Sequence, residues 1–406
     1  MAAETRVFPP ELVRMVLGFL RNEKPTLACC TLVSKSFFPI AQPALFYTIS
    51  RHGEIASFVK HLQRSSRTNS YIHNLHLRGG FQGILPTKAR TIVRRTRPQK
   101  ERLPLADFQA VIASLPQLEI LLVQELCLTT THESTDESGG TTYIRPTISR
   151  LILVGVNEEN ESTSGLLRTL SCFSEIHELV LNTIFVLDED GDEYEESPSP
   201  LPLVHSLVHE MSLDTTRPLC NALLKAGIAR SLQSVDVICV YWEDIEALGE
   251  VLTAAGPSVK RVVFDPVGVF DEDSFDDHRA ETWQTLCLAR CTNLEELVLY
   301  VSLSLEEDDP DPTMDEALSG WSAARLAEQH MDWTQLEAVF DCFALLSTVT
   351  FELEESAPPD HFKSCRETIE QKMPTSKAKG RLRFATRAIE RDPKKLTATF
   401  SDLCIR

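Results

Sequence analysis

The sequence predicts an α/β protein in which a small all-helical N-terminal unit precedes an irregular solenoid of parallel strands alternating with helices. Three short apolar segments crowd into the first 47 residues. From residue 72 onward, one six-residue pattern (apolar, two of any kind, apolar, any, apolar) recurs nine times. Segments with apolar residues at three- and four-residue spacing, typical of amphipathic helices, separate most of these hexamers. We therefore predict domains at 1–50 and 51–390, followed by a tail or cap at 391–406.

The composition and net charge of the chain exclude several classes of protein. The chain has 406 residues, 43% of them apolar, and a net charge of −19. This acidic balance argues against a protein that grips nucleic acid or an anionic membrane. No 18-residue apolar run and no secretory signal are present, so we expect no membrane span. Eleven scattered cysteines are typical of a reducing compartment, which predicts a cytoplasmic or nuclear protein.

The stretch FPPELVRMVLGFL opens the N-terminal unit and predicts a helix over 10–20. Pro10 suits the first helical turn, where its missing N–H has no partner to lose. The helix carries two apolar stripes, whereas a helix at the edge of a globular fold normally has one. The stripes consist of Leu12, Val16 and Phe19, and of Val13, Leu17 and Leu20. Two stripes imply two partners, one of them the helix's own domain.

Two further short helices complete this unit. Pro25 is placed to begin one of them, and Ser34 can cap the next. Pro43 and the segment ALFY then close the unit. Three short helices are close to the lower size limit for an independent core. The alternative interpretation is that they only cap the larger body.

These residues resemble the F-box, the motif by which substrate receptors dock on the Skp adaptor of cullin ubiquitin ligases. The family opening Leu-Pro-x-Glu-Leu is matched by Phe8 to Leu12, and Ile-Phe-x-x-Leu by Val16 to Leu20. Val-Cys/Ser-Lys-x-Trp is matched by Val33 to Phe37. Phe8 replaces the usual Leu and Phe37 the usual Trp, so both positions stay large and apolar.

The resemblance implies a receptor that binds the Skp adaptor, and through it a cullin ligase, together with an unknown protein substrate. The residues that it implies for adaptor binding are Pro9, Leu12, Val16, Leu20, Leu27, Val33 and Phe37.

The repeated hexamers predict strands of the body. They begin at Ile72, Leu118, Ile148, Ile176, Val208, Leu232, Val259, Leu294 and Leu346. The alternation of strand and helix resembles a leucine-rich-repeat solenoid, although the Asn that usually follows the strand is absent. A compact, doubly wound α/β domain is the alternative. An F-box followed by such a body resembles the receptors that fungi encode in great number.

Strand alternation predicts which side chains of each hexamer point inward. The fourth and sixth positions should enter the core, and the third and fifth should point away from it. An outward aliphatic row is either covered or offered to a partner. The residues that we predict for a substrate-binding face are Leu122, Ile152, Val180, Val263 and Val298, with Arg150 and Arg261.

Charged segments interrupt the repeats. Residues 88–102 are basic, and acidic runs begin at Asp188, Asp271 and Glu306. We interpret all four as solvated insertions, because the first lacks aromatic residues for base stacking and the Asp188 run fails the EF-hand spacing.

No catalytic motif is found. The segment RGGFQG lacks the ending of a phosphate loop, and no Gly-x-Ser-x-Gly elbow occurs. His205 and His209 lack the glutamate of a zinc protease and are interpreted as the start of a strand. We expect a non-catalytic receptor without metal or cofactor; an interaction scaffold outside any ligase, or an enzyme with a site assembled from distant residues, is the alternative.

Overall fold

The computed structural model describes residues 9–82, 99–129, 145–158, 163–182, 200–210, 216–239, 242–265, 285–301, 333–354 and 359–387. The chain divides into two compact units. One contains Met1–Ile176 with Pro198–Pro202 and Ala398–Arg406, and the other contains His177–Ser197 and Leu203–Thr397. The domain boundaries at 50 and 390 stay a prediction, and the tail at 391–406 lies outside the described residues.

Eleven strands form one open, parallel sheet. They are β1 (Thr48–His52), β2 (Asn74–Arg78), β5 (Ile120–Gln124), β7 (Thr147–Val154), β9 (Glu175–Asn182), β10 (Leu203–Glu210), β11 (Ser234–Ile238), β12 (Arg261–Asp265), β13 (Glu296–Val301), β14 (Thr348–Glu354) and β15 (Leu382–Arg387). Their order in the sheet follows the chain. A doubly wound sheet reverses its order at a switch point. The described strands show no reversal, so the doubly wound alternative is wrong for them.

A second, four-stranded sheet lies in the first unit. Its order is β3 (Phe81–Gln82), β4 (Gln99–Pro104), β6 (Leu126–Thr129) and β8 (Asn157–Glu158). The pair β3 and β4 is antiparallel, and the pairs β4 with β6 and β6 with β8 are parallel. This sheet was not predicted from the sequence.

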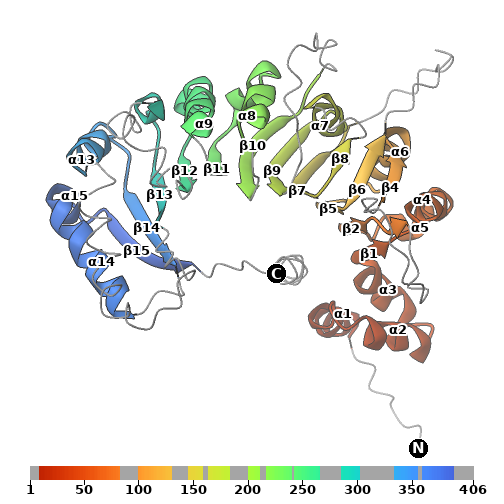
Figure 1. The fold of residues 1–406 in the computed structure, drawn as a ribbon. Helices are drawn as coiled ribbons and strands as arrows, with labels where there is room; N and C mark the ends of the chain where they lie inside the picture. Colours follow the sequence, from red (N-terminus) through yellow and green to blue (C-terminus); the bar gives the residue numbers. More distant parts are fainter. Residues whose placement is uncertain are drawn as a thin grey trace, which may run out of the picture. The chain divides into compact units, whose positions relative to one another are not determined.

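The helices of the first unit include the three predicted at the N-terminus, which Figure 1 shows as one group next to β1. They are α1 (Pro10–Phe19), α2 (Lys24–Val33), α3 (Phe38–Phe46), α4 (Ile55–Arg64), α5 (Ser66–Asn69), α6 (Leu105–Ala113) and α7 (Thr163–Leu170).

The second unit pairs most of its strands with a preceding helix. Its helical elements are α8 (Thr216–Lys225), η1 (Ile228–Ser231), α9 (Trp242–Ala255), η2 (Gly256–Ser258), η4 (Leu288–Arg290), α13 (Trp333–Asp341), α14 (Pro359–Lys372) and α15 (Pro374–Ala378). In Figure 1, α8, α9 and α13 flank the strands β10 to β14 on one side.

The hexamers predicted from the sequence lie on the strands, with one exception. Eight of the nine coincide with β2, β5, β7, β9, β11, β12, β13 and β14. Their fourth and sixth residues, such as Leu75 and Leu77 or Leu297 and Leu299, are at most 1% exposed. The predicted alternation of inward positions is therefore confirmed.

The exception is the fifth hexamer. We predicted it to begin at Val208, but Ser206 of β10 pairs with Ser234 of β11, which places the start at Val204. The sixth position then falls on His209, which is only 2% exposed. Because a search for apolar residues rejects histidine at this position, the true register was missed.

His209 fills a position that is aliphatic or aromatic in the other hexamers. Burial lowers the pKa of His209 from 6.5 to about 4, so the ring is neutral at pH 7. A neutral imidazole loses less hydration free energy on burial than a charged one, which explains why the core accepts it.

Part of the basic segment also belongs to the fold. Residues 88–98 lie outside the described part of the chain, as do the acidic runs at Asp188, Asp271 and Glu306, but Gln99–Pro104 forms β4. Glu101 in β4 is 8% exposed. Its Oε1 accepts the N–H of Ile55 at 2.7 Å and its Oε2 accepts that of Gly80 at 2.9 Å. Glu101 thereby ties the first turn of α4 to the second sheet.

We predict that Glu101→Gln lowers the free energy of unfolding by about 1–3 kcal/mol, because the amide presents an N–H₂ group where a backbone N–H needs an acceptor. Urea denaturation followed by circular dichroism measures the loss. Glu54→Gln, which alters an exposed side chain on the same turn, is the matched control and should change the free energy by less than about 0.5 kcal/mol. An equal effect of the two substitutions would contradict the structural role of Glu101.

We also predict a pH dependence from His209. The unfolded chain binds a proton at this side chain below pH 6.5, whereas the folded chain binds one only near pH 4. The contribution of His209 to stability is therefore complete above pH 6.5 and is lost as the pH falls from 6.5 toward 4. When the pH is lowered from 7.5 to 5.0, the free energy of unfolding of the wild type should fall by about 2 kcal/mol more than that of the His209→Leu variant. Urea titrations at the two pH values compare them, and parallel losses would refute the prediction.

Candidate interaction surface

The three N-terminal helices share a small apolar core. Leu17 of α1, Leu27 of α2 and Ala41 of α3 are at most 3% exposed. Partly buried apolar side chains pack around them, namely Val13, Leu20, Cys30, Ile40, Ala44 and Leu45. One of the two predicted stripes of α1 thus faces this core, because Val13, Leu17 and Leu20 all belong to it.

The other stripe of α1 is bare. Leu12 is 41% exposed, Val16 58% and Phe19 84%. Met15, beside them on the helix, is 56% exposed. Helical spacing puts these side chains on one side of α1, so the helix presents an apolar face to solvent. This confirms that α1 has one stripe turned inward and one left uncovered.

Exposed apolar side chains continue on the next two helices. Leu32 and Val33 at the end of α2 are 85% and 69% exposed, and Phe38 at the start of α3 is 43% exposed. Among the described residues, seven of the nine large exposed apolar side chains lie on α1, α2 and α3. We call these seven residues, Leu12, Met15, Val16, Phe19, Leu32, Val33 and Phe38, the bare apolar set. Such a concentration marks an interaction site more often than chance exposure does.

The predicted adaptor-binding residues fall into three groups. Pro9, Leu12, Val16 and Val33 are exposed. Leu20 and Phe37 are half-buried, and Leu20 packs against the helical core. Leu27 is fully buried, so its prediction as a contact residue is wrong. Both sides of α2 carry apolar residues, and only the packing of the three helices decides which of them turns inward.

Local contacts hold the bare apolar set in place. The carbonyl of Pro9 accepts the N–H groups of Leu12 and Val13, which starts α1. Ser34 Oγ accepts the N–H of Phe37 at 3.2 Å in the turn between α2 and α3. The prediction that Ser34 caps α3 is wrong, because α3 begins at Phe38 and its N-cap is Phe37. Lys24 Nζ donates to the carbonyl of Leu45 at 2.9 Å. Burial and, secondarily, nearby Arg21 lower the pKa of Lys24.

The predicted substrate-binding face is largely covered. Its five aliphatic residues, Leu122, Ile152, Val180, Val263 and Val298, are 0–3% exposed. A partner cannot touch them, so the prediction of an exposed aliphatic row is wrong. Strands of a parallel sheet are commonly buried on both faces, which explains the aliphatic fifth positions.

The two predicted arginines remain accessible. Arg150 and Arg261 are half-buried, and Arg261 Nε lies 3.0 Å from Glu296 Oε2 on the neighbouring strand. Both members of this ion pair are about 40% exposed. An ion pair this accessible to water contributes little to stability.

The second position of the hexamers was not considered from the sequence and proves polar. In the first unit, the rings of Tyr47 and His73 stack with centroids 4.6 Å apart, and His73 Nδ1 lies 2.8 Å from Glu119 Oε1. In the second unit, His177 and His205 stack at 5.3 Å, and Gln233 Nε2 lies 3.2 Å from His205 Nδ1. We call these second-position residues the strand-start row.

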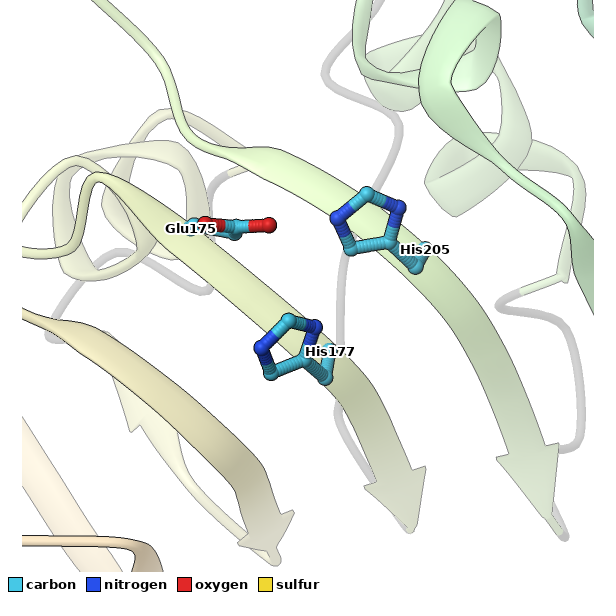
Figure 2. Close-up of side chains that lie close together, drawn as sticks. All are labelled: Glu175, His177 and His205. Atoms are coloured by element: carbon cyan, nitrogen blue, oxygen red, sulfur yellow. The ribbon is translucent and has the colours of Figure 1, made fainter.

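Two residues of the strand-start row, together with Glu175, could hold a metal ion. Glu175, His177 and His205 each offer a ligand atom, and these atoms lie within 4.8 Å of one another. Figure 2 shows the three side chains side by side on β9 and β10. Among the described residues, no other group of three such side chains meets this distance criterion.

Comparison with known proteins does not identify the chain. No protein-family model and no curated protein matches its sequence. Among the described helices, none has the length and apolar character that crossing a bilayer requires.

We predict opposite effects for two apolar residues of α2. Leu27→Ala should destabilise the helical unit by about 2–5 kcal/mol, because it opens a cavity in the core. Val33→Ala removes an exposed side chain and should change stability by less than about 0.5 kcal/mol. Hydrogen exchange of peptides from α1–α3 measures both effects. Equal protection in the two variants would show that Leu27 is not a core residue.

Proposed function

We propose that this chain is the substrate receptor of a Skp–cullin–F-box ubiquitin ligase, which docks on the Skp adaptor through α1–α3 and holds a target protein with its repeat body. The observation that carries this proposal is the bare apolar set on three otherwise well-packed helices. An exposed apolar face of this kind needs a protein partner to cover it.

The resemblance to the F-box supports the same partner. Of the matched segments, PPEL (residues 9–12) lies at the start of α1, VLGFL at its end, and VSKSF at the turn between α2 and α3. Four of the seven residues that the resemblance implies for docking are exposed. The adaptor would cover Leu12, Val16 and Val33, leaving Leu27 to stabilise the helical core.

The body is proposed to be an irregular leucine-rich-repeat-like solenoid. In the eleven-stranded sheet, each strand after the first lies beside the sheet strand that precedes it along the chain, as stacking of successive repeats requires. The buried fourth and sixth positions give the body one repeated core layer. Since the aliphatic fifth positions are buried, target contacts would come from accessible polar side chains such as Arg150 and Arg261.

In this function the chain performs no bond chemistry. Binding the adaptor and the target at once raises the effective concentration of target lysines near the ubiquitin carrier of the ligase. The required properties are two separate binding surfaces and a stiff connection between them.

A non-catalytic interaction scaffold is the second candidate. In that function α1–α3 would merely cap the body, and the outer stripe of α1 would be covered by it. The exposure of Val16 and Phe19, 58% and 84%, favours docking of another protein instead.

The test is binding of the full chain to a purified Skp adaptor, measured by isothermal titration calorimetry. Val16→Asp should weaken binding at least about 100-fold, because the complex would bury an unpaired carboxylate. Leu12→Asp should act in the same way. Arg14→Asp is the matched control: it changes charge more, on the side of α1 that carries neither stripe, and should change affinity less than about threefold.

Circular dichroism establishes that each variant keeps its fold. A wild-type chain that does not bind the adaptor would refute the proposal. Equal weakening by Arg14→Asp and Val16→Asp would show that charge, and not the apolar stripe, governs the interaction.

A further inference from the structure

Two histidines and a glutamate come together where β9 and β10 begin. Glu175 and His177 are two residues apart on β9, so strand alternation turns them to the same face. His205 occupies the second position of the hexamer that begins at Val204 on β10, as His177 does in the hexamer that begins at Ile176 on β9. The position of the three side chains therefore follows from the backbone of two neighbouring strands and not from a loop.

The three groups are close enough for one ion. Their ligand atoms lie within 4.8 Å of one another, and the two imidazole rings are nearly parallel, with 21° between their planes. A tetrahedral ion with bonds of 2.0–2.1 Å places neighbouring ligand atoms about 3.4 Å apart. Rotation of the imidazole and carboxylate groups about their side-chain bonds would bring the ligand atoms from within 4.8 Å to that spacing.

The accessibility of the group suits an ion exchanged with solvent. His177 is exposed, whereas Glu175 and His205 are half-buried. Figure 2 shows the Glu175 carboxylate lying beside the rings of both histidines. A cation at this place would neutralise the carboxylate and keep one side open to water.

Gln233 on the next repeat can orient His205. Its side-chain Nε2 lies 3.2 Å from Nδ1 of His205. Metal-binding histidines usually donate their second ring N–H to an acceptor, and this fixes the ring. A half turn of the Gln233 amide would bring its oxygen to Nδ1 and supply that acceptor.

We propose that Glu175, His177 and His205 form a binding site for a divalent transition-metal ion, with Zn²⁺ as the best fit. Two imidazoles and one carboxylate are a ligand set that zinc uses with one coordination position open. Mg²⁺ and Ca²⁺ prefer oxygen ligands, so two histidines disfavour them. The site does not depend on the proposed docking function.

The experiment titrates ZnCl₂ into the full chain, stripped of metal, by isothermal titration calorimetry. The wild type should bind one ion at the site. His177→Ala and His205→Ala should each weaken that binding more than about tenfold, since loss of an outer partner alone costs 10–100-fold. Gln233→Ala should weaken it by about tenfold as a positioning residue.

His73→Ala is the matched control, because His73 also occupies the strand-start row and pairs with a glutamate, Glu119. It should leave zinc affinity unchanged. His177→Gln serves as a second variant if the alanine variants unfold. CoCl₂ gives an independent readout, because a nitrogen and oxygen site shows visible absorption without the ultraviolet thiolate band.

Two results would overturn the proposal. One is a chain that binds no Zn²⁺ at micromolar concentration. The other is binding that persists in the His177→Ala/His205→Ala double variant, as it would if cysteine thiols such as Cys29 and Cys30 were the ligands.

Discussion

Pairing of parallel strands in one register is the interaction on which the rest of the structure depends. The carbonyl of Tyr47 accepts the N–H groups of both His73 and Asn74, each at 3.0 Å, and His73 accepts those of Glu119 and Ile120 at 2.8 and 3.0 Å. The same double acceptance recurs in the second unit at Gln233 and Lys260. Because strands of both units start from this bond, equivalent hexamer positions align across neighbouring strands. Alignment buries the fourth and sixth side chains in one layer and brings the polar second positions together.

The hexamers could be predicted because strand alternation is a local property of the chain. The strands that escaped prediction break the pattern for identifiable reasons. His209 stands at an apolar position because its imidazole is buried in the neutral form. In β1 the sixth hexamer position is Arg51, whose Nε donates a hydrogen bond to the carbonyl of Gly53. In the repeat that contains β15, the first hexamer position is Lys379, whereas the nine predicted hexamers begin with an aliphatic residue. Edge strands have one neighbour instead of two, so they need less apolar surface.

The sequence predicted some residues of the candidate surfaces correctly and others wrongly. Two apolar stripes on α1 were sufficient to foresee that one of them stays bare. Leu27 and Val33 could not be told apart, because both are apolar and only the packing of α2 against α1 and α3 separates them. For the fifth positions, alternation gives the direction of a side chain but not whether that face is covered. His205 was considered only together with His209, and His177 was not considered, since the proximity of His177 and His205 appears only once β10 is placed in its true register.

A receptor that works by proximity needs a fixed geometry between its docking helices and its target surface. A flexible linker would let the target sample a larger volume and would lower its effective concentration near the ubiquitin carrier. In this chain α3 ends at Phe46 and β1 begins at Thr48, so Tyr47 alone connects them. The Arg21 guanidinium lies 4.3 Å from the centre of the Tyr47 ring, and that ring stacks on His73 of the next repeat. Burial raises the pKa of Tyr47, which keeps its hydroxyl neutral beside Glu119. These contacts join the three N-terminal helices directly to the first strands of the sheet. The proposed mechanism requires such a connection, because it fixes the docking helices relative to the strands that follow them.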